Sequence, residues 1–114
     1  MSSDSPIDVV DRQIAAYNDG DTEAFVAEFA EDAVVTGLAD EAEPMAVGEA
    51  ALRELYGQQF EAVSPEAEVL DRIALGEYVV DHERIEQDDG AEMEAIGVYR
   101  VVDGEISRLW LAHE

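Results

Sequence analysis

The sequence contains no cysteine, no lysine and no long hydrophobic run. Without cysteine the chain can form no disulfide, no thiolate nucleophile and no cysteine-ligated zinc site. No apolar stretch approaches the roughly 18–20 residues that span a membrane, and the first ten residues lack the basic region of an export signal. We therefore expect a cytoplasmic protein with no membrane partner. The length of 114 residues predicts one domain over residues 1–114.

Positive charge is also scarce. Six arginines face 29 Asp and Glu residues, which gives a formal net charge of −23. Nucleic acid is not expected as a partner, because phosphate binding needs clustered cations. The acidic residues occur in every segment and the hydrophobic fraction is 47%, so a folded core is expected and not an acidic tail. Dispersed acidity of this kind is typical of halophilic proteins, whose carboxylates keep them hydrated. A nucleic-acid mimic is the alternative, although a mimic concentrates its charge on one face.

The first half of the chain predicts three helices and a short strand. Residues Ser5–Asp8 read as a helix start, with a Ser cap, Pro at the first helical position and an acid at the third. Residues 18–21, Asn-Asp-Gly-Asp, end this helix and cap a second one that contains Phe25 and Phe29. A short strand at residues 34–35, a loop over 37–47 and a third helix from Gly48 follow.

The second half predicts four antiparallel strands. Three turn dipeptides, Gly76-Glu77, Asp89-Gly90 and Asp103-Gly104, separate runs rich in β-forming residues. These runs cover residues 67–75, 78–87, 92–102 and 106–112. Helices followed by a strand meander predict an α+β fold.

The turns also predict which residues face one another across the sheet. If each turn has two residues, Asp71 lies opposite His82, His82 opposite Gly97, and Gly97 opposite Trp110. The opposite face would then carry Arg72 across from Asp81.

The predicted row of Asp71, His82 and Gly97 suggests acid–base chemistry. An Asp opposite a His fixes the imidazole's tautomer, as a general acid or base near neutral pH requires. This predicts His82 as the proton-transfer group, Asp71 as its orienting residue and Arg84 as a contact for an anion or oxyanion. Gly97 would leave room for a ligand, and the aromatic residues expected to line that space are Tyr17, Tyr56, Tyr99 and Trp110. The structural alternative is a simple cross-strand ion pair, with Trp110 packed over Gly97 as core.

A metal site is not expected. Adjacent strand residues point to opposite faces, so Asp81, His82 and Glu83 cannot bind one ion together. The chain has only two histidines, and it lacks a phosphate-binding loop or nucleotide fingerprint, so we expect no cofactor.

Four stretches carry a resemblance to a known family. They are IAAYNDGD at residues 14–21, FVAEFAEDAVV at 25–35, and residues 48–60 and 98–106. In this order they resemble the SnoaL-like branch of the nuclear transport factor 2-like (cystatin-like) superfamily, which includes ketosteroid isomerases and polyketide cyclases. The resemblance implies a cone: a strongly curved antiparallel sheet wrapped around three N-terminal helices, with a pocket inside. It also implies a homodimer formed through the outer sheet face.

The resemblance does not extend to the ketosteroid isomerase catalytic groups. The family's tyrosine, aspartate base and protonated aspartic acid correspond here to Gln13, Gly37 and Gly97. Without these groups the steroid isomerase mechanism cannot operate.

Two functions remain open at this point. In the first, the protein binds a small molecule. It would then act as a cofactor-free acid–base enzyme of isomerase, cyclase or hydrolase type on an apolar, carbonyl-bearing substrate. The other is a non-catalytic dimeric association module with a filled cone. An open cavity beside an Asp71–His82 contact favours the first, whereas a filled cone or an outward His82 favours the second.

Overall fold

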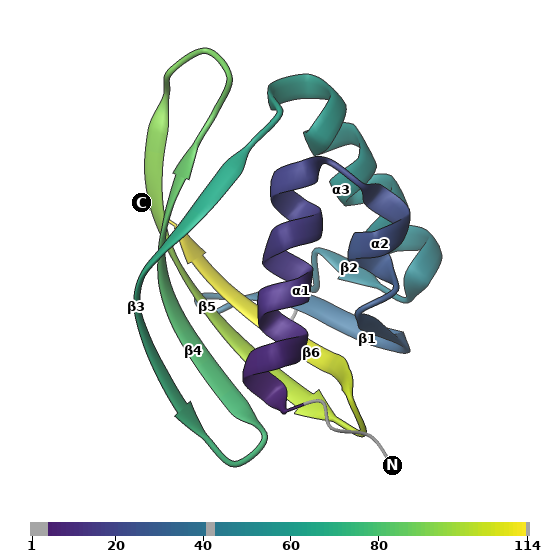
Figure 1. Ribbon diagram of the computed structural model, residues 1–114. Coiled ribbons are helices and arrows are strands. Elements are labelled where there is room, and N and C mark those ends of the chain that lie inside the picture. Colours follow the sequence, from purple (N-terminus) through teal and green to yellow (C-terminus); the bar gives the residue numbers. More distant parts are fainter. Residues whose placement is uncertain (1–4, 41–42, 114) are drawn as a thin grey trace.

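Three helices pack against one side of a curved, unclosed six-stranded sheet in the computed structural model, which describes residues 5–40 and 43–113 (Figure 1). The helices are α1 (Pro6–Asp19), α2 (Thr22–Val26) and α3 (Glu49–Val63). The strands are β1 (Phe29–Gly37), β2 (Ala46–Val47), β3 (Glu66–Leu75), β4 (Tyr78–Glu86), β5 (Glu92–Val102) and β6 (Glu105–His113). The predicted α+β fold with a curved sheet is therefore confirmed.

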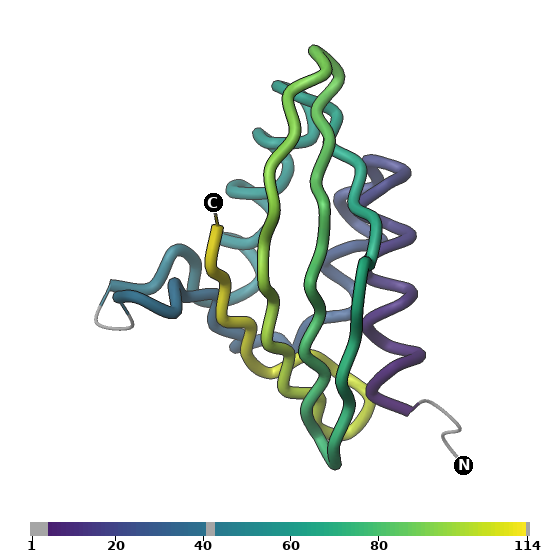
Figure 2. The backbone as a smooth tube through the Cα atoms, turned by 90° about the vertical axis from the view of Figure 1, so that its left-hand side faces the viewer, coloured from purple at the N-terminus to yellow at the C-terminus, as the bar shows by residue number. Residues whose placement is uncertain are grey.

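The strands follow the order β2-β1-β6-β5-β4-β3 across the sheet. Neighbours are antiparallel except β1 and β6, which run parallel. Figure 2 looks onto the outer face of the sheet and shows β3, β4 and β5 in front of the helices. No helix in the described part of the chain is long and apolar enough to cross a membrane.

The start of α1 agrees with its sequence signals. The Ser5 hydroxyl accepts a hydrogen bond from the Asp8 backbone N–H, and the Asp8 carboxylate accepts one from the Ser5 N–H, both at 3.2 Å. This capping box satisfies two backbone donors that the helix itself leaves unpaired. Gly20 follows the last turn with φ +67°, a conformation that favours glycine.

The second helix is shorter, and the first strand longer, than predicted. Helix α2 ends at Val26, and Phe29 already pairs with Ile106 on β6. The one-turn spacing of Phe25 and Phe29 was therefore a misleading signal, because both rings enter the same core from a helix and a strand, with centroids 5.1 Å apart. The predicted loop over 37–47 also contains β2, whose residue Ala46 pairs with Val35.

Aromatic rings form the core between the three helices and the sheet. Tyr17, Phe25, Tyr56 and Phe60 form a continuous cluster with ring centroids 4.4–6.5 Å apart. Tilted and edge-on pairs of this kind stabilise a core beyond the area that they bury. The cluster joins α1, α2 and α3 into one support for the sheet.

The sheet register agrees with the prediction in one hairpin only. Between β3 and β4 the predicted pairs Asp71–His82 and Arg72–Asp81 are confirmed, and the register shifts only beyond them, between Val69 and Asp71. Between β4 and β5 the turn has three residues, 88–90, because Gln87 donates its N–H to the Ala91 carbonyl and Gly90 adopts φ +88°. That extra residue pairs His82 with Ile96 and Asp81 with Gly97, so the predicted His82–Gly97 pair is wrong.

A bulge changes the register between β5 and β6. The Asp103-Gly104 turn is a two-residue turn with positive φ at both positions, as predicted. The pairing then shifts between Arg100 and Val101, which places Gly97 opposite Leu111 and Trp110 opposite Val98. The predicted Gly97–Trp110 pair is therefore wrong. A shift of one residue moves a side chain to the other face of the sheet.

Candidate functional site

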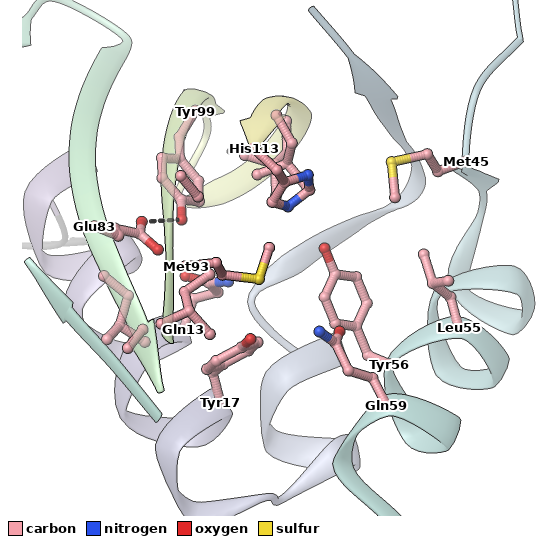
Figure 3. Close-up of a pocket in the computed structure, with 16 residues that line it drawn as sticks. Gln13, Tyr17, Met45, Leu55, Tyr56, Gln59, Glu83, Met93, Tyr99 and His113 are labelled. Atoms are coloured by element: carbon pink, nitrogen blue, oxygen red, sulfur yellow. Dashed lines mark hydrogen bonds between the residues drawn. The ribbon is translucent and has the colours of Figure 1, made fainter. Parts of the chain in front are cut away.

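A pocket lies between the helices and the inner face of the sheet (Figure 3). Its cavity volume is about 100 Å³. The walls come from α1, α3 and strands β3 to β6, with Met45 before β2 at the rim. The lining residues are Gln13, Ile14, Tyr17, Met45, Leu55, Tyr56, Gln59, Ala67, Glu83, Ile85, Met93, Ala95, Tyr99, Leu109, Leu111 and His113. The cone is therefore only partly filled.

Glu83 is the acidic residue in this lining. It lies on β4 with only 7% of its surface exposed, and its Oε2 accepts a hydrogen bond of 3.0 Å from the Tyr99 hydroxyl (Figure 3). Burial raises the pKa of Glu83 to about 7, and the Tyr99 hydrogen bond limits the rise. A carboxyl group with this pKa exchanges a proton readily near neutral pH.

A buried ion pair adjoins Glu83 on the same strand face. Asp81 is fully buried and accepts two hydrogen bonds from Arg72, Nε to Oδ1 at 2.7 Å and Nη2 to Oδ2 at 3.0 Å. The remaining guanidinium nitrogen of Arg72, Nη1, donates a hydrogen bond of 2.8 Å to Asp11 Oδ1 on α1. These bonds raise the pKa of Arg72, with the Asp81 hydrogen bond as the main cause. Because Asp81 engages Arg72 with both oxygens, Glu83 is left as the carboxyl group of β4 that reaches the pocket.

Three tyrosines surround the same space. Tyr17 comes from α1, Tyr56 from α3 and Tyr99 from β5. Burial raises the pKa of each phenol, and the charge of Glu83 adds to the rise in all three. The hydroxyls therefore remain protonated and can donate hydrogen bonds.

Gly97 faces inward and makes room for the Tyr99 ring. A Cβ atom at Gly97 would lie 3.0 Å from Tyr99 Cε1 and 3.3 Å from its hydroxyl oxygen. The ring thus lies along β5 over Gly97, and this position brings its hydroxyl to Glu83. The space that the sequence assigned to a ligand at Gly97 is occupied by Tyr99.

The residues predicted to carry out the chemistry lie on the outer face. His82 is exposed, and its Nε2 is 2.5 Å from Glu94 Oε1. Asp71 is paired with His82 in the sheet, but its Oδ1 accepts a hydrogen bond from the Arg72 backbone N–H. Arg84 is exposed and donates to Glu68 at 3.1 Å. None of the three lines the pocket, and their catalytic role stays a prediction.

The predicted ligand-binding residues divide between the two faces. Tyr17, Tyr56 and Tyr99 line the pocket. Trp110 lies on the outer face, where its ring is 5.2 Å from the Arg108 guanidinium carbon. Among the described residues, no group of three or more His, Asp or Glu side chains is arranged to hold a metal ion.

Glu83 was not among the predicted site residues, because the predicted chemistry lies on the outer face of β4. The inward residues of this strand are Val79, Asp81, Glu83 and Ile85. The apolar residues at both ends of this set were the available signal, since they mark the buried face. His113 at the rim shares an inner-face row with Glu83 through Ala95.

The comparisons with known proteins give one family match and several solved structures of similar fold. The SnoaL-like domain matches residues 10–109. An uncharacterised cystatin-fold protein from Novosphingobium aromaticivorans aligns with a TM-score of 0.86 and 22% identity, over 96% of this chain and 99% of its own. A candidate polyketide cyclase from Sinorhizobium meliloti has a TM-score of 0.79 and 25% identity, over 96% and 100% of the two chains.

A third similar structure is that of SalBIII, an epoxide hydrolase/cyclase-like enzyme with a role in pyran ring formation in the polyether salinomycin. It aligns with a TM-score of 0.82 and 20% identity, over 96% of this chain and 90% of its own. A search of curated proteins gives no match. The domain match, which covers most of the chain, agrees with the resemblance of the four sequence stretches, and this protein therefore belongs to the SnoaL-like family.

Proposed function

We propose that the protein catalyses cofactor-independent proton transfer on a small, apolar, carbonyl-bearing molecule, with Glu83 as the group that takes and returns the proton. The observation that carries the proposal is a buried carboxyl group in the pocket wall whose pKa is raised to about 7. Perturbed carboxyl groups in apolar pockets are typical of acid–base catalysts. The names of the cyclase-like relatives support the same class of chemistry.

The proposed step uses neutral donors and one ionised base. Glu83 carboxylate removes a proton from the carbon beside the carbonyl, and the electron pair of that C–H bond forms an enolate. The negative charge develops on the carbonyl oxygen, where the Tyr17 or Tyr56 hydroxyl stabilises it by a hydrogen bond. The protonated Glu83 then returns a proton to carbon, so the group is regenerated without a cofactor.

The pocket size limits the substrate. A cavity of about 100 Å³ is smaller than the roughly 300–1,000 Å³ of drug-sized ligand sites. The volume of this cavity suits a molecule with a single small ring. A larger molecule requires the Met45 and Met93 side chains at the pocket to move, which the flexible thioether chain of methionine allows.

Exchange of α-protons for deuterium in D₂O tests the proposal without knowledge of the natural substrate. We expect the protein to accelerate exchange in cyclopentanone, followed by proton NMR. The rate should rise with pH to a plateau with a midpoint near 7, because the ionised form of Glu83 is the base. Glu83→Gln should lower the rate by roughly 100-fold or more, since the amide cannot accept the proton.

Outer-face variants provide the control. Glu94→Gln and His82→Ala remove the exposed pair and should leave exchange unchanged. Loss of exchange in His82→Ala with full activity in Glu83→Gln would contradict the proposal and restore the assignment made from sequence. No acceleration by the wild-type protein would favour the non-catalytic alternative.

We also propose that the protein forms a homodimer through the outer face of the sheet. Ile73, Val80, Val98 and Trp110 form one apolar row across four strands. Ile73 is 69% exposed and the neighbouring Leu75 is 81% exposed. No other described segment covers these strands (Figure 2). Apolar patches of this kind mark association surfaces. The cytoplasmic location and the halophilic origin stay predictions.

Sedimentation at high salt tests the dimer. We expect Ile73→Gln to raise the dimer dissociation constant by about tenfold or more, because it replaces a highly exposed apolar side chain at the β3 end of the row with an amide. Ile7→Gln, at a partly exposed apolar position on α1, is the control and should leave the dissociation constant unchanged. A wild-type protein that stays monomeric at every concentration would contradict the proposal.

A further inference from the structure

Gln13 is a polar residue on the buried face of α1. That face otherwise carries Val9, Val10, Ala16 and Tyr17. Gln13 is only 4% exposed and lines the pocket one helical turn before Tyr17, and Figure 3 shows its side chain in the same space as Tyr17 and Glu83. The amide therefore belongs to the wall that a ligand would touch.

The side-chain oxygen of Gln13, Oε1, lacks a hydrogen-bond donor. In the described part of the chain only two buried side-chain atoms lack a hydrogen-bond partner, Gln13 Oε1 and Arg108 Nε. Arg108 lies on the outer face beside Trp110, away from the pocket. A buried acceptor without a donor destabilises the protein, whereas an apolar side chain of the same length would not. A ligand that donates a hydrogen bond to this oxygen would remove the penalty.

The rest of the lining defines the charge of that ligand. The pocket contains Glu83 but no arginine, and its basic residue is His113 at the rim, in a chain of net charge −23. Beside Gln13 and Glu83, an anionic ligand would lose its hydration without gaining a cationic partner. The neutral tyrosine hydroxyls suit an uncharged oxygen acceptor on the same molecule.

We propose that Gln13 is a specificity-determining residue whose Oε1 accepts a hydrogen bond from a hydroxyl group of an uncharged substrate. This inference rests on the proposed function, because it concerns the same pocket. Together with the carbonyl group on which Glu83 acts, it defines the substrate class as a neutral hydroxy-carbonyl compound. Gln13 thus selects the substrate and takes no part in the proton transfer.

Phenol and toluene are suitable probes, because they have nearly the same shape but only phenol donates a hydrogen bond. Their dissociation constants can be measured at pH 6 by NMR titration of the wild-type protein, Gln13→Met and Gln59→Met. Gln59 is a half-buried glutamine that lines the same pocket from α3, so it is the matched control. The informative quantity is the ratio of the toluene constant to the phenol constant, because it cancels general changes in pocket shape.

We expect this ratio to fall roughly five- to tenfold in Gln13→Met, the effect of one hydrogen bond, and to stay within twofold in Gln59→Met. Gln13→Leu should reproduce the change if methionine disturbs the helix. An unchanged ratio in both Gln13 variants would overturn the inference, as would an equal fall in Gln59→Met. Benzaldehyde accepts but does not donate, so a specific weakening of benzaldehyde in Gln13→Met would also overturn it. If benzoate binds as tightly as benzaldehyde, the proposal that the substrate is uncharged is refuted.

The outcomes for the two proposals are separable. If phenol binding depends on Gln13 while deuterium exchange does not depend on Glu83, the ligand class stands and the catalytic proposal fails. If exchange depends on Glu83 but the toluene-to-phenol ratio is unchanged in the Gln13 variants, only the inference about Gln13 fails. If neither phenol nor toluene binds, the inference about Gln13 is refuted, and the exchange rate in cyclopentanone alone decides the catalytic proposal.

Discussion

Because glycine has no side chain, Gly97 allows the Tyr99 ring to lie over it and to hydrogen-bond with Glu83. In Gly97→Ala the new methyl group would meet the buried Tyr99 ring at 3.0 Å, and we expect the displaced ring to weaken its hydrogen bond to Glu83. We expect a loss of about 1–3 kcal/mol in the free energy of unfolding, as is usual for overpacking. The pKa of Glu83 should rise from about 7, because the Tyr99 hydrogen bond is the larger of the two interactions that lower it. Carbon-detected NMR titration of the Glu83 carboxyl measures this shift directly.

Gly57→Ala is the matched control at the residue scale. A Cβ atom at Gly57, inside α3, would meet Thr22 at 3.7 Å, an ordinary contact. This change should stabilise the protein by up to about 1 kcal/mol, since alanine is the better helix former, and should leave the Glu83 pKa unchanged. A Gly97→Ala protein with the wild-type Glu83 titration would show that Tyr99 is not held in place by Gly97.

At the scale of elements, one side chain connects α1 to the edge strand β3. Asn18 Oδ1 accepts a hydrogen bond from the Ala67 N–H at 2.6 Å, and its Nδ2 donates to the Ala67 carbonyl at 3.0 Å. The amide thus replaces a neighbouring strand at the edge of the sheet, a position where unpaired backbone groups invite aggregation. Asn18→Ala should lower the free energy of unfolding by roughly 2 kcal/mol, because two hydrogen bonds are lost and their buried partners remain.

Urea unfolding at constant salt measures this effect. Asp19→Ala, at the exposed neighbouring position, should change the free energy of unfolding by less than about 0.5 kcal/mol. Equal effects of the two substitutions would show that the Asn18–Ala67 contact contributes nothing to stability.

The predictability of each element depended on whether its signals were local. The capping box at Ser5 and the Asp103-Gly104 turn involve adjacent residues, and both formed as expected. The bulge near Arg100 and the three-residue turn before Ala91 have no comparable local signature, and each moved the register by one position.

The same distinction applies to the candidate site. Tyr17 and Tyr56 lie on helices, where the spacing of apolar residues identifies the buried face, and both reach the pocket. The role of Glu83 depends on which face of β4 is covered by the helices, and this is a property of the tertiary structure. The apolar residues Val79 and Ile85 are the local signal for the buried face, and the charged residues on both faces of the strand weaken that signal.

At the scale of the whole molecule, repulsion among the carboxylates opposes folding. The radius of gyration is 13.2 Å, comparable to the screening length of about 10 Å at 0.1 M salt but far longer than the ~3 Å at 1 M. Raising NaCl from 0.1 to 1 M should therefore raise the melting temperature by at least about 5 °C. If screening is the cause, NaCl and NaBr should act equally at equal ionic strength. A melting temperature that does not rise with salt would contradict this account.

The parallel pairing of β1 with β6 also determines the order in which the sheet can be completed. Strand β6 lies between β1 and β5, although it is the last of the six to emerge from the ribosome. Until then, the β1–β2 pair and the β3–β5 meander have no common border, and each presents an open edge. Contacts between residues 29–37 and 106–111 are among the most distant in sequence, and such closure slows folding. The nascent chain therefore carries two unfinished half-sheets in the interval between the completion of β5 and that of β6, and repulsion between the negative charges of neighbouring copies opposes edge-to-edge pairing during that interval.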